Sequence, residues 1–438
     1  MDHENEKVGK RNLRTFCAGA TLNDIGEEMY APFLPYFAAT FLGVTPAQYG
    51  LIEGITEAIN RILRLVTGWF SDRVGRKIPV VLGYILIALS RLGLPLVKGW
   101  AGFIPFRGLR QVGRSLRDPA REACIAECFP DEKRGRAFGF LNMVDTAGAI
   151  LGPIIGLIIL YVITQGFSLS IFSSGFMQKI WAGFKISFPR ESYIWLFVCA
   201  ALPTIISGWI IYFFLFETKV PSSLFKKTES TAQKHKSQND NSFSIFTFIS
   251  SLKSGGPLHA LSMITLSHMI LALGAIPVSM ILLYGYKELS ASVFEGAILF
   301  IGYSITHFIT SYPAGWLTDR IGRYYAQVVA NILLIIALIT TIFIRQPLLL
   351  IVPLILYGTF ESIWIANRRA AISDLAPTET LAQTMGTFSA LYGITSLICP
   401  ILFGGIWGAS SSGWAFFGAA LFPFLAIFLH QKDKVIIE

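Results

Sequence analysis

The chain of 438 residues is 53% hydrophobic and only 14% charged, and its mean hydropathy is +0.58. A soluble globular domain has about 25% charged residues, so this composition excludes an ordinary soluble protein. The net charge of +9 would favour nucleic acid as a partner only if the positions of the basic residues were ignored.

Long apolar segments recur along the chain, and each is long enough to cross about 30 Å of hydrocarbon as a helix. The sequence therefore predicts an all-α membrane protein that crosses the bilayer many times. We expect about twelve membrane-spanning helices, over residues 14–39, 48–70, 78–98, 101–124, 138–163, 192–216, 259–285, 291–316, 325–345, 348–373, 381–408 and 413–430.

A polar segment rich in Ser, Lys and Gln, residues 219–242, separates the first six expected helices from the last six. It has no apolar periodicity and is typical of a linker. The predicted organisation is a six-helix bundle over residues 1–216, a cytoplasmic linker over 217–257 and a second six-helix bundle over 258–438.

The Lys and Arg residues outside the expected helices gather on one side: at the N-terminus, after the even-numbered helices and at the C-terminus. The positive-inside rule then places both termini in the cytoplasm, and we expect a multi-pass protein of the cell (inner) membrane. The first segment contains Asp24, Glu27 and Glu28, which distinguishes it from a cleaved signal peptide. The five cysteines lie within expected helices and predict neither disulfides nor a metal site, so no cofactor is expected.

One loop sequence occurs twice. GWFSDRVGR, which begins at Gly68, recurs as GWLTDRIGR from Gly315, an offset of 247 residues. A constant offset predicts an internal repeat, and parallel six-helix repeats with a site at their interface describe one class of secondary transporter. The same offset relates Arg121 to Arg368, Glu127 to Asp374 and Pro153 to Pro400.

These two loops resemble the signature loop of the major facilitator superfamily, G-x-L-[AS]-D-R-x-G-R-[KR], with Phe70 where Leu is usual. The resemblance covers all twelve helices and implies two pseudo-symmetric six-helix bundles and a monomer. It also implies that the loop latches the two halves together in the outward-open state. The alternative is a plain anchor at the cytoplasmic headgroups. The gate residues implied are Gly68, Asp72, Arg73, Gly75, Arg76, Asp319, Arg320 and Arg323.

A glycine pattern follows in the fifth expected helix: Gly139, Gly148, Gly152, Pro153 and Gly156. It resembles the helix 5 pattern of exporters and antiporters in the same superfamily. Small residues at helical spacing permit close helix contact, and a proline can bend a helix. The pattern favours export by antiport, and ordinary tight packing is the alternative.

The fourth expected helix carries five arginines, spaced 3, 4, 3 and 4 residues apart, from Arg107 to Arg121. At about 100° per residue they fall within an arc of roughly 80°. A charge at the centre of a membrane helix costs about 3 kcal/mol, so this face is a candidate site. The alternative is a closed salt-bridge network with neighbouring groups, which are Asp24, Glu27, Glu28, Glu53, Glu57, Asp118, Glu122, Arg61 and Arg64.

Protonation of one carboxylate would free an arginine to bind an anion, which would couple proton and substrate. The proton-coupling candidates are Asp24, Glu27, Glu28 and Glu57. The resemblance implies a central cavity between helices 1, 4, 7 and 10. His307 is a weaker candidate, since it can equally be a packing hydrogen-bonder. The substrate-binding candidates are Arg110, Arg114, Arg117, Asn60, Arg61, His268, Glu361, Asn367, Arg368 and Tyr392.

The segment NDIGEEMYAPFLPYF and the arginine helix also resemble a little-described prokaryotic branch of the superfamily, with Ser115 in place of a glycine. The sequence has no G-x-x-x-x-G-K-[ST] loop, zinc motif or G-x-S-x-G elbow, so neither an ATP-driven pump nor an enzyme is expected. The prediction is a proton-coupled transporter of a small anion, such as an organic acid, a phosphorylated metabolite or a carboxylate siderophore. Efflux of amphipathic, drug-like compounds is the first alternative, and a non-transporting receptor or channel is the second. The expected partners are the solute, protons and the bilayer, and not nucleic acid.

Overall fold

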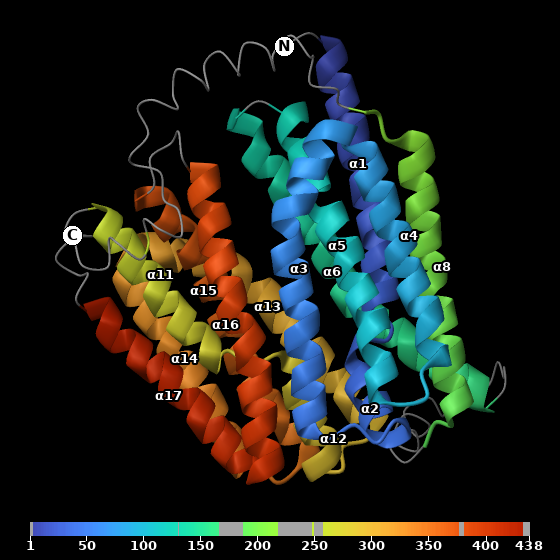
Figure 1. Ribbon diagram of the computed structural model, residues 1–438, viewed down its shortest axis with the longest axis vertical. Helices are drawn as coiled ribbons and strands as arrows, with labels where there is room; N and C mark the ends of the chain where they lie inside the picture. Colours follow the sequence, from blue (N-terminus) through green and yellow to red (C-terminus); the bar gives the residue numbers. More distant parts are fainter. Residues whose placement is uncertain are drawn as a thin grey trace, which may run out of the picture.

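The computed structural model describes residues 3–129, 131–165, 187–217, 248, 257–375 and 381–431. All elements in these ranges are helices, as predicted, and they form two groups that lie side by side (Figure 1). The first group contains α1 (His3–Glu28), α2 (Leu34–Phe41), α3 (Pro46–Val74), α4 (Lys77–Gly93), α5 (Trp100–Cys128), α6 (Asp131–Gln165) and α8 (Arg190–Phe214). The second contains α11 (Pro257–Gly274), α12 (Val278–Glu288), α13 (Val293–Ile321), α14 (Arg323–Phe343), α15 (Ile351–Leu375), α16 (Leu381–Ala409) and α17 (Ser412–Gln431).

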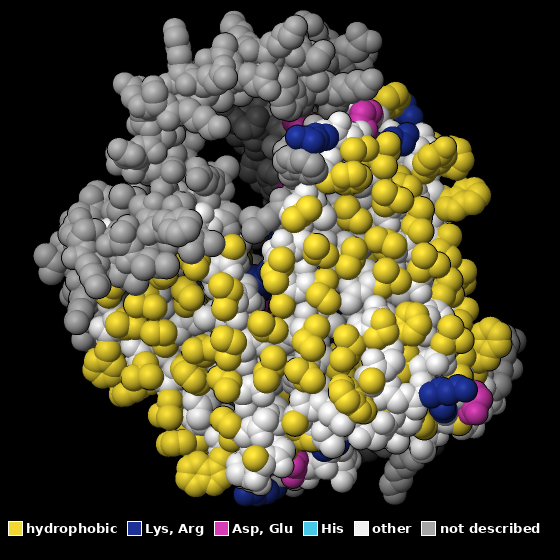
Figure 2. Space-filling model, viewed as in Figure 1, with side chains coloured by type: hydrophobic (Ala, Val, Ile, Leu, Met, Phe, Trp, Pro, Cys, Tyr) yellow, Lys and Arg dark blue, Asp and Glu magenta, His cyan; other side chains and the backbone are white. Residues whose placement is uncertain are grey.

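The outer surface is apolar, as a bilayer requires. Hydrophobic side chains cover most of the visible face between the two ends of the molecule (Figure 2). Within the described residues, nine helical segments are long and apolar enough to cross a membrane. The spans that fail this test are α1 with α2, α3 and α5, because these helices carry the acids and arginines noted above.

The first helix of each half is broken, and the prediction of continuous helices over 14–39 and 259–285 was wrong in this respect. α1 begins at His3 and ends at Glu28, a short 3-10 turn spans Ala31–Phe33, and α2 begins at Leu34. In the second half α11 ends at Gly274 and α12 begins after Pro277. Proline lacks the backbone N–H that would continue an α-helix, and Pro32 and Pro277 lie in the two breaks.

The offset of 247 found in the sequence relates α3 to α13 end to end. Each begins with a capping box, formed by Thr45 and Gln48 in α3 and by Ser292 and Glu295 in α13. Each ends at a glycine with positive φ, 99° at Gly75 and 84° at Gly322. The repeat is therefore present in the local stereochemistry that starts and stops the helices.

The two halves pack against each other most extensively through α3 and α16, and also through α6 and α13. Small residues permit the first contact: a Cβ added to Gly54 would lie 2.5 Å from the Leu397 carbonyl oxygen. At the end of the molecule away from the N-terminus, α2 and α12 lie together (Figure 1). There the Tyr286 hydroxyl donates to the Pro32 carbonyl at 2.9 Å, and the Tyr36 and Tyr286 rings are 5.2 Å apart. This end is closed.

Candidate functional site

A cavity of about 330 Å³ lies between the two halves. The first half supplies α1, α5 and α6, and the second half supplies α13. The lining differs from the expected set of helices 1, 4, 7 and 10, because α13 is the eighth span and α6 the fifth. The lining residues are Asn23, Asp24, Glu27, Glu28, Arg110, Arg114, Arg117, Asp118, Arg121, Ala149, Phe300, Tyr303, Ser304 and His307.

The arginine face of α5 points into this cavity, as the spacing predicted. Arg110, Arg114, Arg117 and Arg121 follow one another at 4, 3 and 4 residues, so they share one side of the helix. Arg107 is the exception: its guanidinium lies 2.6 Å from the Glu53 carboxylate on α3, and it does not line the cavity.

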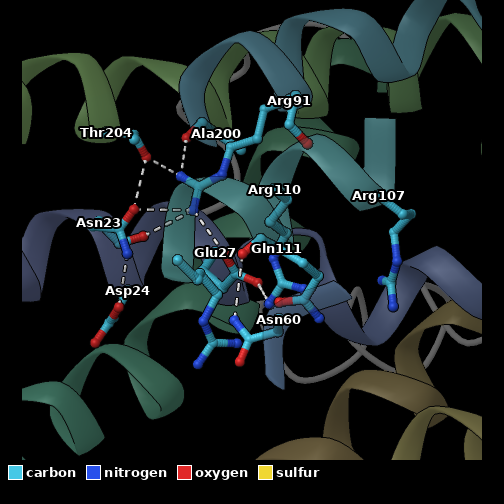
Figure 3. A network of polar contacts seen from close by, with 12 residues as sticks. Asn23, Asp24, Glu27, Asn60, Arg91, Arg107, Arg110, Gln111, Ala200 and Thr204 are labelled. Atoms are coloured by element: carbon cyan, nitrogen blue, oxygen red, sulfur yellow. Dashed lines mark hydrogen bonds and ion pairs between the residues drawn. The ribbon is translucent and has the colours of Figure 1, made fainter. Parts of the chain in front are cut away.

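Glu27 is held by two arginines (Figure 3). Arg110 forms an ion pair with it from the cavity side, and Arg91 Nη2 donates to it at 2.9 Å from behind. Arg91 belongs to α4 and is completely buried. Its guanidinium also donates to the Asn23 and Ala200 carbonyls at 3.2 and 2.9 Å and to the Thr204 hydroxyl. Such charge-assisted bonds hold the Glu27 side chain in place.

The sequence reasoning missed Arg91. The signal was present, since Arg91 is the one charged residue between Ile78 and Val97 and an isolated membrane arginine needs a partner. Its partners lie on α1 and α8, and no spacing in the sequence shows that these helices are its neighbours.

A second carboxylate, Asp118, is shared by three arginines. Arg64 and Arg117 lie 2.9 and 2.8 Å from its oxygens, whereas Arg114 lies 3.9 Å away. The Arg114 side chain keeps 39% of its surface exposed, against 5% for Arg117 and 11% for Arg110. Arg114 is thus the most accessible of these three cavity-lining guanidiniums.

The other two acids of the cavity belong to α1. Asp24 accepts a hydrogen bond from the Asn23 side chain at 2.9 Å. One carboxylate oxygen of Glu28, Oε2, is buried and has no hydrogen-bond partner among the described residues. An unsatisfied buried carboxylate oxygen is costly, and in this respect Glu28 differs from the paired Glu27 and Asp118.

The helix 5 glycines lie directly against this part of α1. A Cβ added to Gly148 would lie 2.8 Å from Asp24 Cβ, and one added to Gly152 would lie 2.6 Å from Glu28 Cβ. A Cβ added to Gly156 would collide with the Met29 carbonyl. The glycine pattern with Pro153 therefore sets the distance between α6 and the helix that carries the acids.

A family model of the Major Facilitator Superfamily matches residues 16–286 and 260–434. The chain belongs to the Major Facilitator Superfamily. It is 29% identical over 422 residues to an uncharacterized MFS-type transporter of Methanocaldococcus jannaschii, covering 96% of this chain and 94% of that protein. Its fold is that of membrane transporters, not enzymes.

More local similarities relate this superfamily member to transporters with named substrates. It is 34% identical over 158 residues to the multidrug resistance protein MdtG of a Rahnella strain, which covers 34% of this chain and 36% of that protein. It is 26% identical over 141 residues to a galacturonate transporter of Dickeya chrysanthemi, covering 32% of this chain and 40% of that protein. Among solved structures, a bacterial homologue of the human lysosomal transporter Spinster superposes with a TM-score of 0.71 at 14% identity, covering 100% of this chain and 98% of that one.

The superfamily signature loops are clamped within each half. Arg76 donates to Glu127 at 2.6 Å, and its repeat counterpart Arg323 donates to Asp374 at 2.9 Å. Arg323 also pairs with Asp319 at 2.7 Å.

The remaining residues of the expected gate do not share one kind of contact. Gly75 is the positive-φ stop of α3, Arg73 is exposed, and Arg320 stacks over the Trp316 ring at 4.9 Å. The side chain of Asp72 and the surroundings of Gly68 lie outside the described residues. At the Gly68 counterpart, Gly315, an added Cβ would meet no atom within 4 Å.

The substrate-binding candidates of the second half do not line the cavity. His268 is buried against Phe388, with ring centroids 5.6 Å apart. Asn367 donates to Gln327 of α14 at 3.0 Å. Glu361 lies behind Tyr303, whose hydroxyl donates to it.

The last of these candidates form a stack at the interface of the halves. Arg368 lies 4.4 Å from the Trp364 ring centroid and 5.5 Å from that of Tyr392. On the other side, Arg61 lies 4.7 Å from the Tyr392 ring and pairs with Glu57 at 2.8 Å. Nearby, Asn60 donates to the Gln111 carbonyl at 3.4 Å (Figure 3).

Proposed function

We propose that this protein is a proton-coupled secondary transporter of a small organic anion, which binds in the cavity between the two halves. The observation that carries the proposal is the exposed guanidinium of Arg114 in that cavity, 3.9 Å from the nearest carboxylate. A guanidinium with unsatisfied donors in a partly dehydrated site is the preferred protein ligand for a carboxylate or phosphate.

The balance of charge supports an anionic substrate. Glu27 is paired with Arg91 and Arg110, and Asp118 is shared by Arg64, Arg114 and Arg117. Two carboxylates therefore serve five arginines. The cavity lining itself contains four arginines and four acids, since Asp24 and Glu28 join Glu27 and Asp118 there. Protonation of Asp24 or Glu28 would therefore leave one positive charge for an anionic substrate.

Glu28 is the best proton carrier among the four proton-coupling candidates. Glu27 is fixed between two guanidiniums, and Glu57 is paired with Arg61 on its own helix and does not line the cavity. Glu28 lines the cavity and leaves one oxygen without a partner among the described residues. Proton and anion would then occupy neighbouring positions, so that binding of one would change the affinity for the other.

The closed end of the molecule lies opposite the end that carries the N-terminus. The arginine face of α5 leads from the cavity towards the N-terminal end. Asn12 of α1 contacts Cys128, at the end of α5, with 3.6 Å between Nδ2 and Sγ. With both termini in the cytoplasm, the cavity would open to the cytoplasm, in the inner membrane of a monomeric transporter. Export by antiport is favoured by the resemblance of the helix 5 glycine pattern to that of exporters and antiporters.

The second candidate function is efflux of amphipathic compounds. The similarity to a multidrug resistance protein and the aromatic side chains on the α13 wall favour it. In that case the arginines would serve as a structural ion-pair network, and removal of one of them would not select between anions and cations.

The test is the substitution Arg114→Gln in purified protein reconstituted in liposomes. We expect loss of transport and binding of organic anions, measured first with a panel of carboxylates and phosphates, with the thermal stability retained. The matched control is the double variant Arg107→Gln/Glu53→Gln, which removes an ion pair of the same helix outside the cavity. The efflux function would be favoured instead if anion flux were unchanged in Arg114→Gln and both this variant and the wild type transported cationic drugs.

A further inference from the structure

The wall of the cavity opposite the arginines is aromatic. Phe300, Tyr303 and His307 lie 3 and 4 residues apart and so occupy one face of α13. The Phe300 and Tyr303 ring centroids are 6.0 Å apart, and those of Tyr303 and His307 are 6.3 Å apart. We call these three residues the aromatic row. Each is partly exposed to the cavity rather than sealed in the core.

The aromatic row is not needed to build the helix. The repeat counterpart of α13 is α3, which has the same length, capping box and glycine stop. At the positions matching Phe300, Tyr303, Ser304 and His307, α3 carries Glu53, Thr56, Glu57 and Asn60. One fold therefore accepts acids and amides at these positions, and the second half has rings there, where they face the cavity.

The hydroxyl groups of this wall are engaged or buried. The Tyr303 hydroxyl is already engaged with Glu361. Phe300 has no polar atom. Ser304 is 96% buried, with 4% of its surface exposed. Ring faces bind other rings in offset or edge-to-face geometry.

We propose that the transported anion carries an aromatic ring, which packs against Phe300, Tyr303 and His307 while its carboxylate or phosphate binds Arg114. This inference rests on the proposed function and narrows its substrate class to aryl or heteroaryl acids. Such a molecule contacts both halves at once, and a cavity of about 330 Å³ lies at the lower end of the size of small-molecule sites. A sugar acid also presents a flat face, but its hydroxyls would find few polar partners on the α13 wall.

The test compares the binding of four probes to the full-length protein in lipid nanodiscs by calorimetry. Benzoate and cyclohexanecarboxylate share charge and approximate size but differ in the π system, galacturonate is a sugar acid, and benzamide keeps the ring without the charge. We expect benzoate to bind about three- to tenfold more tightly than cyclohexanecarboxylate, and more tightly than galacturonate and benzamide.

Three variants separate the possible failures. The double variant Phe300→Leu/His307→Leu should bind benzoate and cyclohexanecarboxylate equally, and Phe300→Leu alone should halve the preference if the double variant does not fold. Phe308→Leu, which changes an exposed ring of the same helix outside the cavity lining, should keep the wild-type preference. Arg114→Gln should bind none of the anions.

The aromatic inference is overturned if all three carboxylates bind equally, or if galacturonate is preferred. If Arg114→Gln then also loses carboxylate binding, the proposed function still stands. Binding that is indifferent to Arg114→Gln, or no binding of any carboxylate, overturns both.

Discussion

Glu27 and Glu28 are adjacent in the sequence and have opposite surroundings. Successive residues of a helix point about 100° apart, so Glu27 faces the buried guanidinium of Arg91 while Glu28 faces α6 and the cavity. The same side chain is thus a fixed counter-ion at one position and, in the proposed function, a proton acceptor at the next.

We predict that replacing Glu28 by Gln impairs transport, whereas replacing Glu27 by Gln impairs stability. Glu28→Gln should abolish transport driven by a pH gradient and retain the fold, because an amide mimics the protonated acid. Glu27→Gln should lower the free energy of unfolding by about 3 kcal/mol, since it leaves the buried Arg91 without its counter-charge. Flux with and without a pH gradient, together with thermal unfolding in detergent, measures both. Proton-driven flux in Glu28→Gln equal to that of the wild type would rule out its role.

For single residues, the sequence predicted the arginine face but not which residues of other helices each side chain contacts. Helical periodicity predicted that Arg110, Arg114 and Arg117 share one side, and the structure confirms their common orientation. Periodicity gives directions relative to one helix only. It could not show that His268 and Asn367 face packing neighbours, because that depends on which helix lies alongside.

Between elements, the closest contact near the site is that of α6 with α1. The Gly152 position has no space for a methyl group, because its Cβ would lie 2.6 Å from Glu28 Cβ and 2.9 Å from the Ile25 carbonyl oxygen. Glu28 and the neighbouring Asp24 of α1 are therefore held in place beside α6 by this contact.

We predict that Gly152→Ala destabilises the protein by about 1–3 kcal/mol through overpacking and slows transport. Gly405→Ala on α16 is the control, since a Cβ there would meet no atom within 4 Å. It should be neutral or stabilising by up to about 1 kcal/mol, because alanine favours a helix over glycine. Thermal unfolding and flux of the two variants provide the comparison, and equal behaviour would show that α6 and α1 can separate freely.

The helices themselves were largely predictable, because an apolar segment of membrane length has few alternatives to a helix. The breaks after α1 and α11 were missed, although Pro32 and Pro277 mark them. A hydrophobicity pattern does not distinguish one long helix from two short ones, since both bury the same side chains.

For the molecule as a whole, a hydrogen bond between the halves lies at the closed end. Tyr286 of α12 donates to the Pro32 carbonyl across the interface. Tyr284, two residues earlier, donates to the Ile344 carbonyl at 3.4 Å within its own half. The two tyrosines therefore form a matched pair for testing what holds this end shut.

We predict that Tyr286→Phe shifts the population towards the state open at this end by about fivefold, as expected for the loss of one hydrogen bond of about 1 kcal/mol. Tyr284→Phe should leave the population unchanged. Spin labels at Thr40→Cys and Lys287→Cys, both exposed near this end, would report the distance distribution. Identical distributions in both variants would show that the hydrogen bond does not contribute to closure.

The division into two halves was visible in the sequence as the offset of 247, and the same offset recurs in caps, glycine stops and the pairs Arg76–Glu127 and Arg323–Asp374. The offset could not predict that the two halves contribute different kinds of side chain to the cavity. The charged side chains that line the described cavity all come from the first half, whereas the second half contributes the rings of α13.

Each ion pair named above joins two residues of the same half, so a motion of one half against the other leaves all of them intact. Among the described residues, such a motion must break apolar packing, glycine-mediated helix contact, the hydrogen bond of Tyr286 and the cation–π contact of Arg61 with Tyr392. The activation barrier of the empty protein should then depend only weakly on ionic strength. The ionic strength of the medium would instead act on the capture of the substrate, through the field of the arginines.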